Sequence, residues 1–205
     1  MSPAARRLAA LVALLVLACV LSPIAQADPL QRHQDNVATA VIEQDGGRAF
    51  DLEFEVLTQR GRDDVDNFNA ANAGARCTGC RATAIAFQIV LVSGMPERLT
   101  PHNRAVAIND QCTQCVVAAE ARQFVRVVDE PVKFTDAGRA VLADVRRQLS
   151  ALEAQDVSLA ELHIAVEAQE ARVLTVMRDE VVPKNDSADE PDVLERRLLQ
   201  DTDLG

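Results

Sequence analysis

Three stretches of the chain have the hydrophobic pattern of β-strands. Residues 49–58 alternate, with Phe50, Leu52, Phe54 and Val56 on one side and Asp51, Glu53 and Glu55 on the other. This alternation predicts a half-buried strand at a sheet edge. Residues 82–93 are apolar on both faces, as expected of a central strand covered on two sides. Residues 116–128 are apolar on one face and carry charges on the other, which predicts the opposite edge.

These stretches belong to a sequence repeat. The motifs CTGC and CTQC place Cys77 and Cys80 at a constant offset of 35 residues from Cys112 and Cys115, and the similarity continues into the strands that follow. A weaker copy without cysteines precedes them. Repeats of roughly 20 to 50 residues mark a supersecondary unit used more than once. Since each unit should follow the same path, we expect the cysteine pairs at the same end of neighbouring strands, about 5 Å apart.

Two glutamines occupy equivalent places in the repeat. Gln88 and Gln123 lie among apolar neighbours, and a buried amide needs hydrogen-bond partners. They predict either a structural hydrogen bond between strands, which we favour, or a shared polar site.

The connections between the strands are less clearly encoded. Thr100 and Pro101 resemble a helix start, which favours a short helix over 101–109 and strand-helix units; the alternation of Ala105 and Ala107 would instead suit a strand. Residues 28–48 are read as a polar lead-in with a short helix near 37–42.

From residue 135 the pattern becomes helical. Apolar residues recur three and four positions apart, and Ser158 with Glu161 forms a capping box. Residues 135–182 therefore predict a helical hairpin with heptad-like spacing, either packed on the sheet or presenting a coiled-coil seam to a copy or an unknown protein partner. Residues 183–205 read as an acidic disordered tail.

The N-terminus has the features of a secretory signal. Arg6 and Arg7 precede an apolar run, and Ala25 and Ala27 provide a small-x-small cleavage site, so residues 1–27 predict a signal peptide and a secreted, extracellular protein. Cys19 offers an alternative lipid-acceptor signal. Without residues 1–27 the chain has 19 basic and 31 acidic residues, a net charge of −12. This charge argues against nucleic acid as a partner and against membrane binding after signal cleavage.

Cysteine pairs spaced C-x-x-C permit three chemistries. Export favours structural disulfides, and the loop-closure argument favours bonds between the repeats. Four thiolates in two such motifs could instead bind zinc, and a thiolate with a lowered pKa could exchange disulfides. His33, His102 and His163 form no metal-protease motif, and we nominate no catalytic residue.

The segments NAANAGARCTGCRATAIAFQIVLV and NRAVAINDQCTQCVVAAEARQFVRVV resemble exported actinobacterial proteins of unknown function, in which CTxCxxxAxAxQ recurs in tandem. Similar segments occur in proteins labelled putative peptide zinc metalloprotease, whose membrane-embedded motif is absent here. The resemblance covers about residues 49–148 and implies an exported repeat domain, with no site residues.

Together these features predict an α+β protein. A small repeat-built β-sheet over residues 49–134, stapled by its cysteine pairs, precedes the C-terminal helical hairpin. The expected function is a secreted, non-catalytic structural or protein-interaction module stabilised by disulfides, without a cofactor. The alternative is an extracytoplasmic metal-binding or thiol-disulfide exchange protein.

Overall fold

The computed structural model describes residues 34–61 and 64–184. Its strands are β1 (Gln34–Ile42), β2 (Arg48–Arg60), β3 (Asp64–Ala75), β4 (Arg81–Ser93), β5 (Arg98–Asn109), β6 (Val116–Val128), β7 (Val132–Phe134) and β8 (Val181–Pro183). Its helices are α2 (Asp136–Ser150), the 3-10 helix η1 (Ala151–Ala154) and α3 (Leu159–Asp179). The structure is therefore α+β, as predicted, whereas the predicted signal peptide, Cys19 and residues 185–205 lie outside the described ranges.

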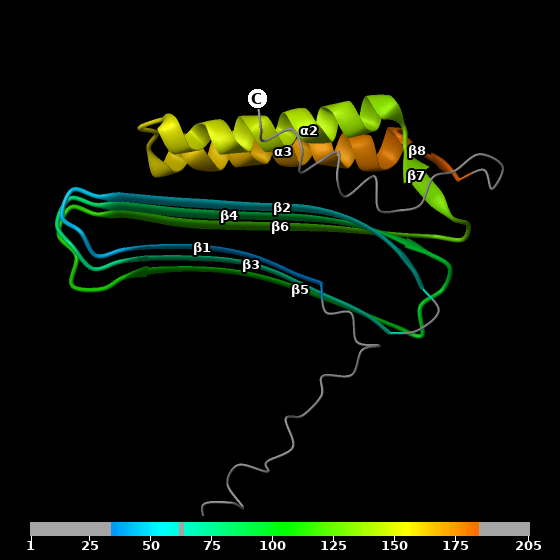
Figure 1. The fold of residues 1–205 in the computed structure, drawn as a ribbon, viewed down its shortest axis with the longest axis horizontal. Coiled ribbons are helices and arrows are strands. Elements are labelled where there is room, and N and C mark those ends of the chain that lie inside the picture. The colour runs from blue at the N-terminus through cyan, green and yellow to red at the C-terminus, as the bar shows by residue number, and fades with distance from the viewer. Residues whose placement is uncertain (1–33, 62–63, 185–205) are drawn as a thin grey trace, which may run out of the picture. The chain divides into compact units, whose positions relative to one another are not determined.

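The first six strands form two parallel sheets stacked on each other. The chain alternates between them, so that one sheet has the order β1-β3-β5 and the other β2-β4-β6 (Figure 1). Corresponding strands pair in register, as in the pairing of Arg81 with Val116, which is the 35-residue offset of the repeat. Each pair of strands is thus one coil of a short β-solenoid. The predicted order of edge, central and edge strand is confirmed for β2, β4 and β6.

Two expected helical segments are strands instead. Residues 101–109 lie in β5, and residues 37–42 lie in β1. In β1, Ala38 and Ala40 are buried and small enough to let the two sheets approach each other; in β5, the exposed Ala105 pairs with the buried Ala71 of β3. Pro101 is accommodated because β5 is an edge strand, where a missing N–H need not break the ladder. The predicted strand-helix units are therefore wrong: the connections between strands are turns.

The helices cover the outer face of the β2-β4-β6 sheet (Figure 1). Ile85, Phe87 and Ile89 of β4 pack there in one core with apolar residues of both helices. The hairpin residues buried in this core are Leu142, Val145, Leu149, Leu152, Leu162, Val166, Val173, Val176 and Met177. Most of the regularly spaced apolar residues of the helices therefore pack on the sheet, as the first of the two interpretations of residues 135–182 predicts.

The helix starts are fixed by side-chain caps. Gly138 N donates to the Thr135 hydroxyl at the start of α2. At the start of α3, Ser158 and Glu161 form both hydrogen bonds of the predicted capping box. No helix in the described ranges is long and apolar enough to cross a membrane.

Candidate functional site: a four-cysteine cluster

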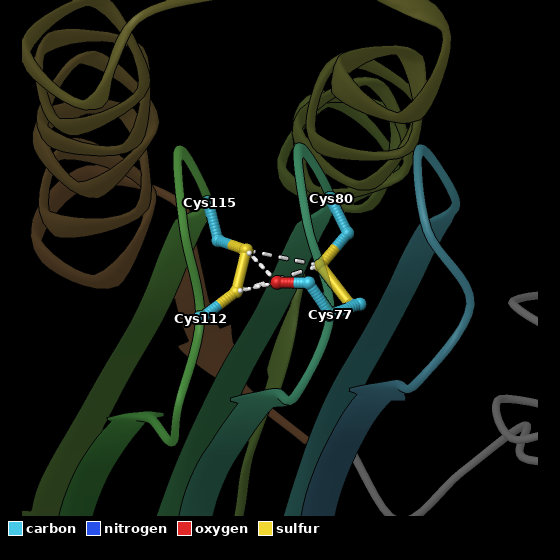
Figure 2. A group of neighbouring side chains, drawn as sticks. All are labelled: Cys77, Cys80, Cys112 and Cys115. Carbon is cyan, nitrogen blue, oxygen red and sulfur yellow. Dashed lines mark hydrogen bonds between the residues drawn. A yellow bond between two sulfur atoms is a disulfide. The ribbon is translucent and has the colours of Figure 1, made fainter.

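The cysteines lie in the turns that carry the chain from one sheet to the other. We call these turns arches: residues 43–47, 76–80 and 110–115. Thr78 and Thr113 form a parallel bridge, and Gly79 N donates to Thr113 O at 2.8 Å, so the second and third arches continue the stacking of the strands. Both cysteine pairs consequently lie at the same end of neighbouring strands, as the repeat predicts (Figure 2).

Left-handed backbone shapes both cysteine arches. Gly79 has φ +67° and Gln114 has φ +58°, at the same place in the two motifs. Glycine adopts this conformation without steric cost, whereas glutamine does not. The conformation turns each arch tightly enough to bring the two cysteines of one motif together, with Cα atoms 6.1 Å apart for Cys77 and Cys80 and 5.9 Å apart for Cys112 and Cys115.

The sulfur atoms within each motif lie at disulfide distance. The expected preference for bonds between the repeats is not met, because each tight arch brings its own two sulfur atoms within bonding distance. A bond within a motif closes a loop of about four residues and stabilises by roughly 2 kcal/mol, against about 4 kcal/mol for a bond from Cys77 to Cys112. Bonds within the motifs therefore stiffen single arches and do not tie one coil to the next.

The two pairs nevertheless form one cluster. Cys80 Sγ lies 3.1 Å from Cys115 Sγ and 3.6 Å from Cys112 Sγ, and all four sulfur atoms lie within 4.8 Å of one another. Cys77 and Cys80 are buried, with 8% and 2% of their surface exposed, and the other two are half-buried. This arrangement can hold two disulfides or, with all four cysteines reduced, one metal ion.

A backbone carbonyl also faces the cluster (Figure 2). Cys77 O lies 2.8 Å from Cys112 Sγ and 3.0 Å from Cys115 Sγ. A disulfide sulfur carries no proton, so these contacts are hydrogen bonds only when Cys112 and Cys115 are reduced to thiols.

The two predicted glutamines lie side by side between the sheets. Gln123 Nε2 donates to Gln88 Oε1 at 2.7 Å, and Gln88 Nε2 donates to Glu55 Oε2 at 3.0 Å. Gln88 is fully buried. These hydrogen bonds run from coil to coil and give both amides partners, which matches the structural interpretation.

A second polar ladder, not predicted from the sequence, is formed by one asparagine from each coil. Asn36 Nδ2 donates to Asn69 Oδ1 at 2.7 Å, and Asn69 Nδ2 donates to Asn103 Oδ1 at 2.8 Å. These amides also donate to carbonyl oxygens of the facing β2-β4-β6 sheet. Spacings of 33 and 34 residues between the asparagines were the signal that could have revealed the ladder.

Acidic residues of β2 face the same interior at the open edge of the first coil. Asp51 and Glu53 pair with Ala84 and Ala86 of β4, whose side chains lie between the sheets. Burial raises the pKa of the Glu53 carboxyl, and the neighbouring Asp51 raises it further.

The two histidines that the structure describes, His102 and His163, do not join the cysteine cluster. His163 contacts Glu120 and Glu167, His102 contacts Asp66, and His33 lies outside the described residues. Comparison of the chain with protein-family models, with curated proteins and with solved structures finds no match.

Proposed function

We propose that this protein is an exported, non-catalytic β-solenoid module that binds a protein partner through its helical hairpin. The observation that carries the proposal is an apolar row on α3 that faces away from the core. The row consists of Ala160, Ile164, Ala168, Ala171 and Leu174, all exposed, with Ile164 64% and Leu174 51% accessible. Their spacing of four, four, three and three residues aligns them along one helix face.

The opposite face of the same helix already fills the core. Leu162, Val166 and Val173 are buried against the sheet and α2. The row at Ile164 is therefore not needed for packing within the described fold. Binding the row to a partner would remove apolar surface from water, which is the main favourable term in protein association.

Export is supported by the N-terminal sequence and by the cysteines. The basic residues, apolar run and small-x-small site of residues 1–27 are those of a secretory signal. Two cysteine pairs at disulfide distance suit an oxidising compartment, where disulfides persist. In this proposal the disulfides stiffen the arches, and the stacked coils hold the hairpin in place.

A photoactivatable amino acid tests the partner surface. Introduced at Ile164 in the exporting cell, it should form a covalent adduct with a second protein on illumination. The matched control carries the same group at Arg147, an exposed position on α2. Adducts from both positions, or from neither, would contradict a specific surface on α3.

A double variant tests the non-catalytic role of the cysteines. Cys80→Ala with Cys115→Ala should lower the thermal stability and the yield of exported protein, and the parent protein should not reduce a disulfide substrate. If the parent catalyses disulfide reduction and the double variant keeps the parent stability without that activity, the cysteines serve exchange and the proposal is wrong.

A further inference from the structure

The two cysteine pairs lie close enough together for all four sulfur atoms to bind one metal ion. Two independent disulfides would not need this proximity. Zinc binds thiolates at about 2.3 Å, which places sulfur atoms about 3.8 Å apart at the corners of a tetrahedron. Across the pairs, Cys80 Sγ already lies 3.1 and 3.6 Å from the sulfur atoms of the third arch. To reach this spacing, the two distances across the pairs would increase by about 0.7 and 0.2 Å, and the larger increase would fall within each pair.

That increase needs no movement of the coils. A change between staggered χ1 rotamers moves a cysteine sulfur by roughly 3 Å with the backbone fixed. The two cysteine arches stay aligned through backbone hydrogen bonds that do not depend on sulfur: Val116 N donates to Cys80 O at 2.9 Å, and Gly79 N donates to Thr113 O at 2.8 Å. Reduction therefore leaves the four ligands gathered in one place.

We propose that the reduced protein binds one Zn²⁺ ion through Cys77, Cys80, Cys112 and Cys115, and that oxidation to the two disulfides releases it. A dithiol reductant supplies two electrons and two protons to each disulfide and becomes a disulfide itself. Zn²⁺ then replaces the four thiol protons. In the reverse direction, an oxidant of the disulfide class removes four electrons from the four thiolates, two S–S bonds form, and Zn²⁺ leaves.

The ion would connect parts of the fold that the disulfides leave separate. Cys77 and Cys80 belong to the second arch, and Cys112 and Cys115 to the third, so a shared ion clamps one coil to the next. Since the ion binds the folded state, it should raise the thermal stability of the reduced protein. Zinc binding should also strengthen as the pH rises, because the thiol protons must leave before the four sulfur atoms can bind the ion.

Cobalt reports such a site directly. The full chain is reduced with a phosphine, freed of reductant without oxygen, and titrated with Co²⁺ and then with Zn²⁺. We expect one Co²⁺ per chain, a thiolate-to-cobalt charge-transfer band, displacement by Zn²⁺, a higher Tm with Zn²⁺, and no binding after reoxidation. No charge-transfer band in the reduced chain, or an equal band in the oxidised chain, would overturn the proposal.

Two variants locate the site. Thr113→Ser, an exposed position in the third arch that adds and removes no thiol, should bind as the parent does, whereas Cys80→Ser should lose the tetrahedral spectrum and the gain in Tm. An unchanged spectrum for Cys80→Ser would overturn the assignment. If Cys80→Ser fails to fold, Cys112→Ser replaces it, because that sulfur is half-buried. The cross-linking result at Ile164 concerns a different surface, so each proposal can fail without the other.

Discussion

The asparagine ladder should contribute a large share of the stability of the solenoid, and Asn69 is its central member. Asn69 is fully buried. Its Nδ2 lies 2.8 Å from Asn103 Oδ1 and 3.1 Å from Arg122 O, and its Oδ1 accepts from Asn36 Nδ2 at 2.7 Å. An amide nitrogen has two protons, so these contacts use the donor capacity of Asn69 in full. Replacing Asn69 with alanine removes these three hydrogen bonds and a longer contact of 3.3 Å from Asn69 Nδ2 to Ala86 O.

The expected loss follows from what the removed amide leaves behind. Each buried hydrogen bond contributes about 1 kcal/mol net, and a buried polar group left without a partner costs about 1 to 3 kcal/mol. Asn36 Nδ2 keeps Phe87 O at 3.0 Å, and the exposed Asn103 can turn to water. Rehydration thus limits the cost to about 3 to 4 kcal/mol for Asn69→Ala, a large part of the stability of a domain of this size.

Urea unfolding followed by circular dichroism measures the loss. Asn72→Ala is the matched control: the same substitution, three residues along the same strand, at a half-buried residue that Arg104 contacts at 3.4 Å. It should cost less than about 0.5 kcal/mol. If Asn69→Ala costs no more than the control, the ladder is not a stabilising element and the reasoning is refuted.

Three further predictions concern the arches, the core and the helices. Gln114→Gly should stabilise the fold by about 1 kcal/mol, because glycine tolerates φ +58°. Gly79→Ala should destabilise the fold by a similar amount: the added Cβ would meet nothing within 4 Å, so only the φ of +67° opposes the substitution. Equal urea midpoints for the parent and both variants would contradict this prediction. Phe87→Ala should cost about 3 to 5 kcal/mol in the same assay, since its buried ring lies 6.0 Å from those of Phe54 and Phe124, and a loss below about 1 kcal/mol would show that the core refills. The hydrogen bond from Arg172 holds the pKa of the Asp144 carboxyl below its usual value of 3.8, so the carboxylate stabilises the fold above that pH and the contribution is lost as the pH falls through the lower folded-state pKa. Asp144→Asn should therefore lower Tm at pH 7, and the difference from the parent should shrink as the pH falls below 3.8. A difference independent of pH would exclude this ion pair as the cause.

The order of β2, β4 and β6 and the positions of the two C-terminal helices could be predicted from the sequence, because both depend on local pattern. The alternation in β2, the apolar run of β4 and the charged face of β6 each report burial on one or two sides. The capping box at Ser158 likewise needs only residues close in sequence. The strand at 101–109 was missed because Thr100 and Pro101 locally resemble a helix start, while pairing with β3 decides the outcome.

The sequence by itself determined that the chain is built from copies, that a helical hairpin follows them, and that two cysteine pairs occupy equivalent places. Only the tertiary structure decided that alternate strands enter different sheets, which sets Asn36, Asn69 and Asn103 in a single ladder across the interior. It also decided that sulfur atoms 35 residues apart in sequence lie 3.1 Å apart in space. Local patterns record whether a side chain is buried, whereas its partner depends on how the coils stack, which is a property of the whole chain.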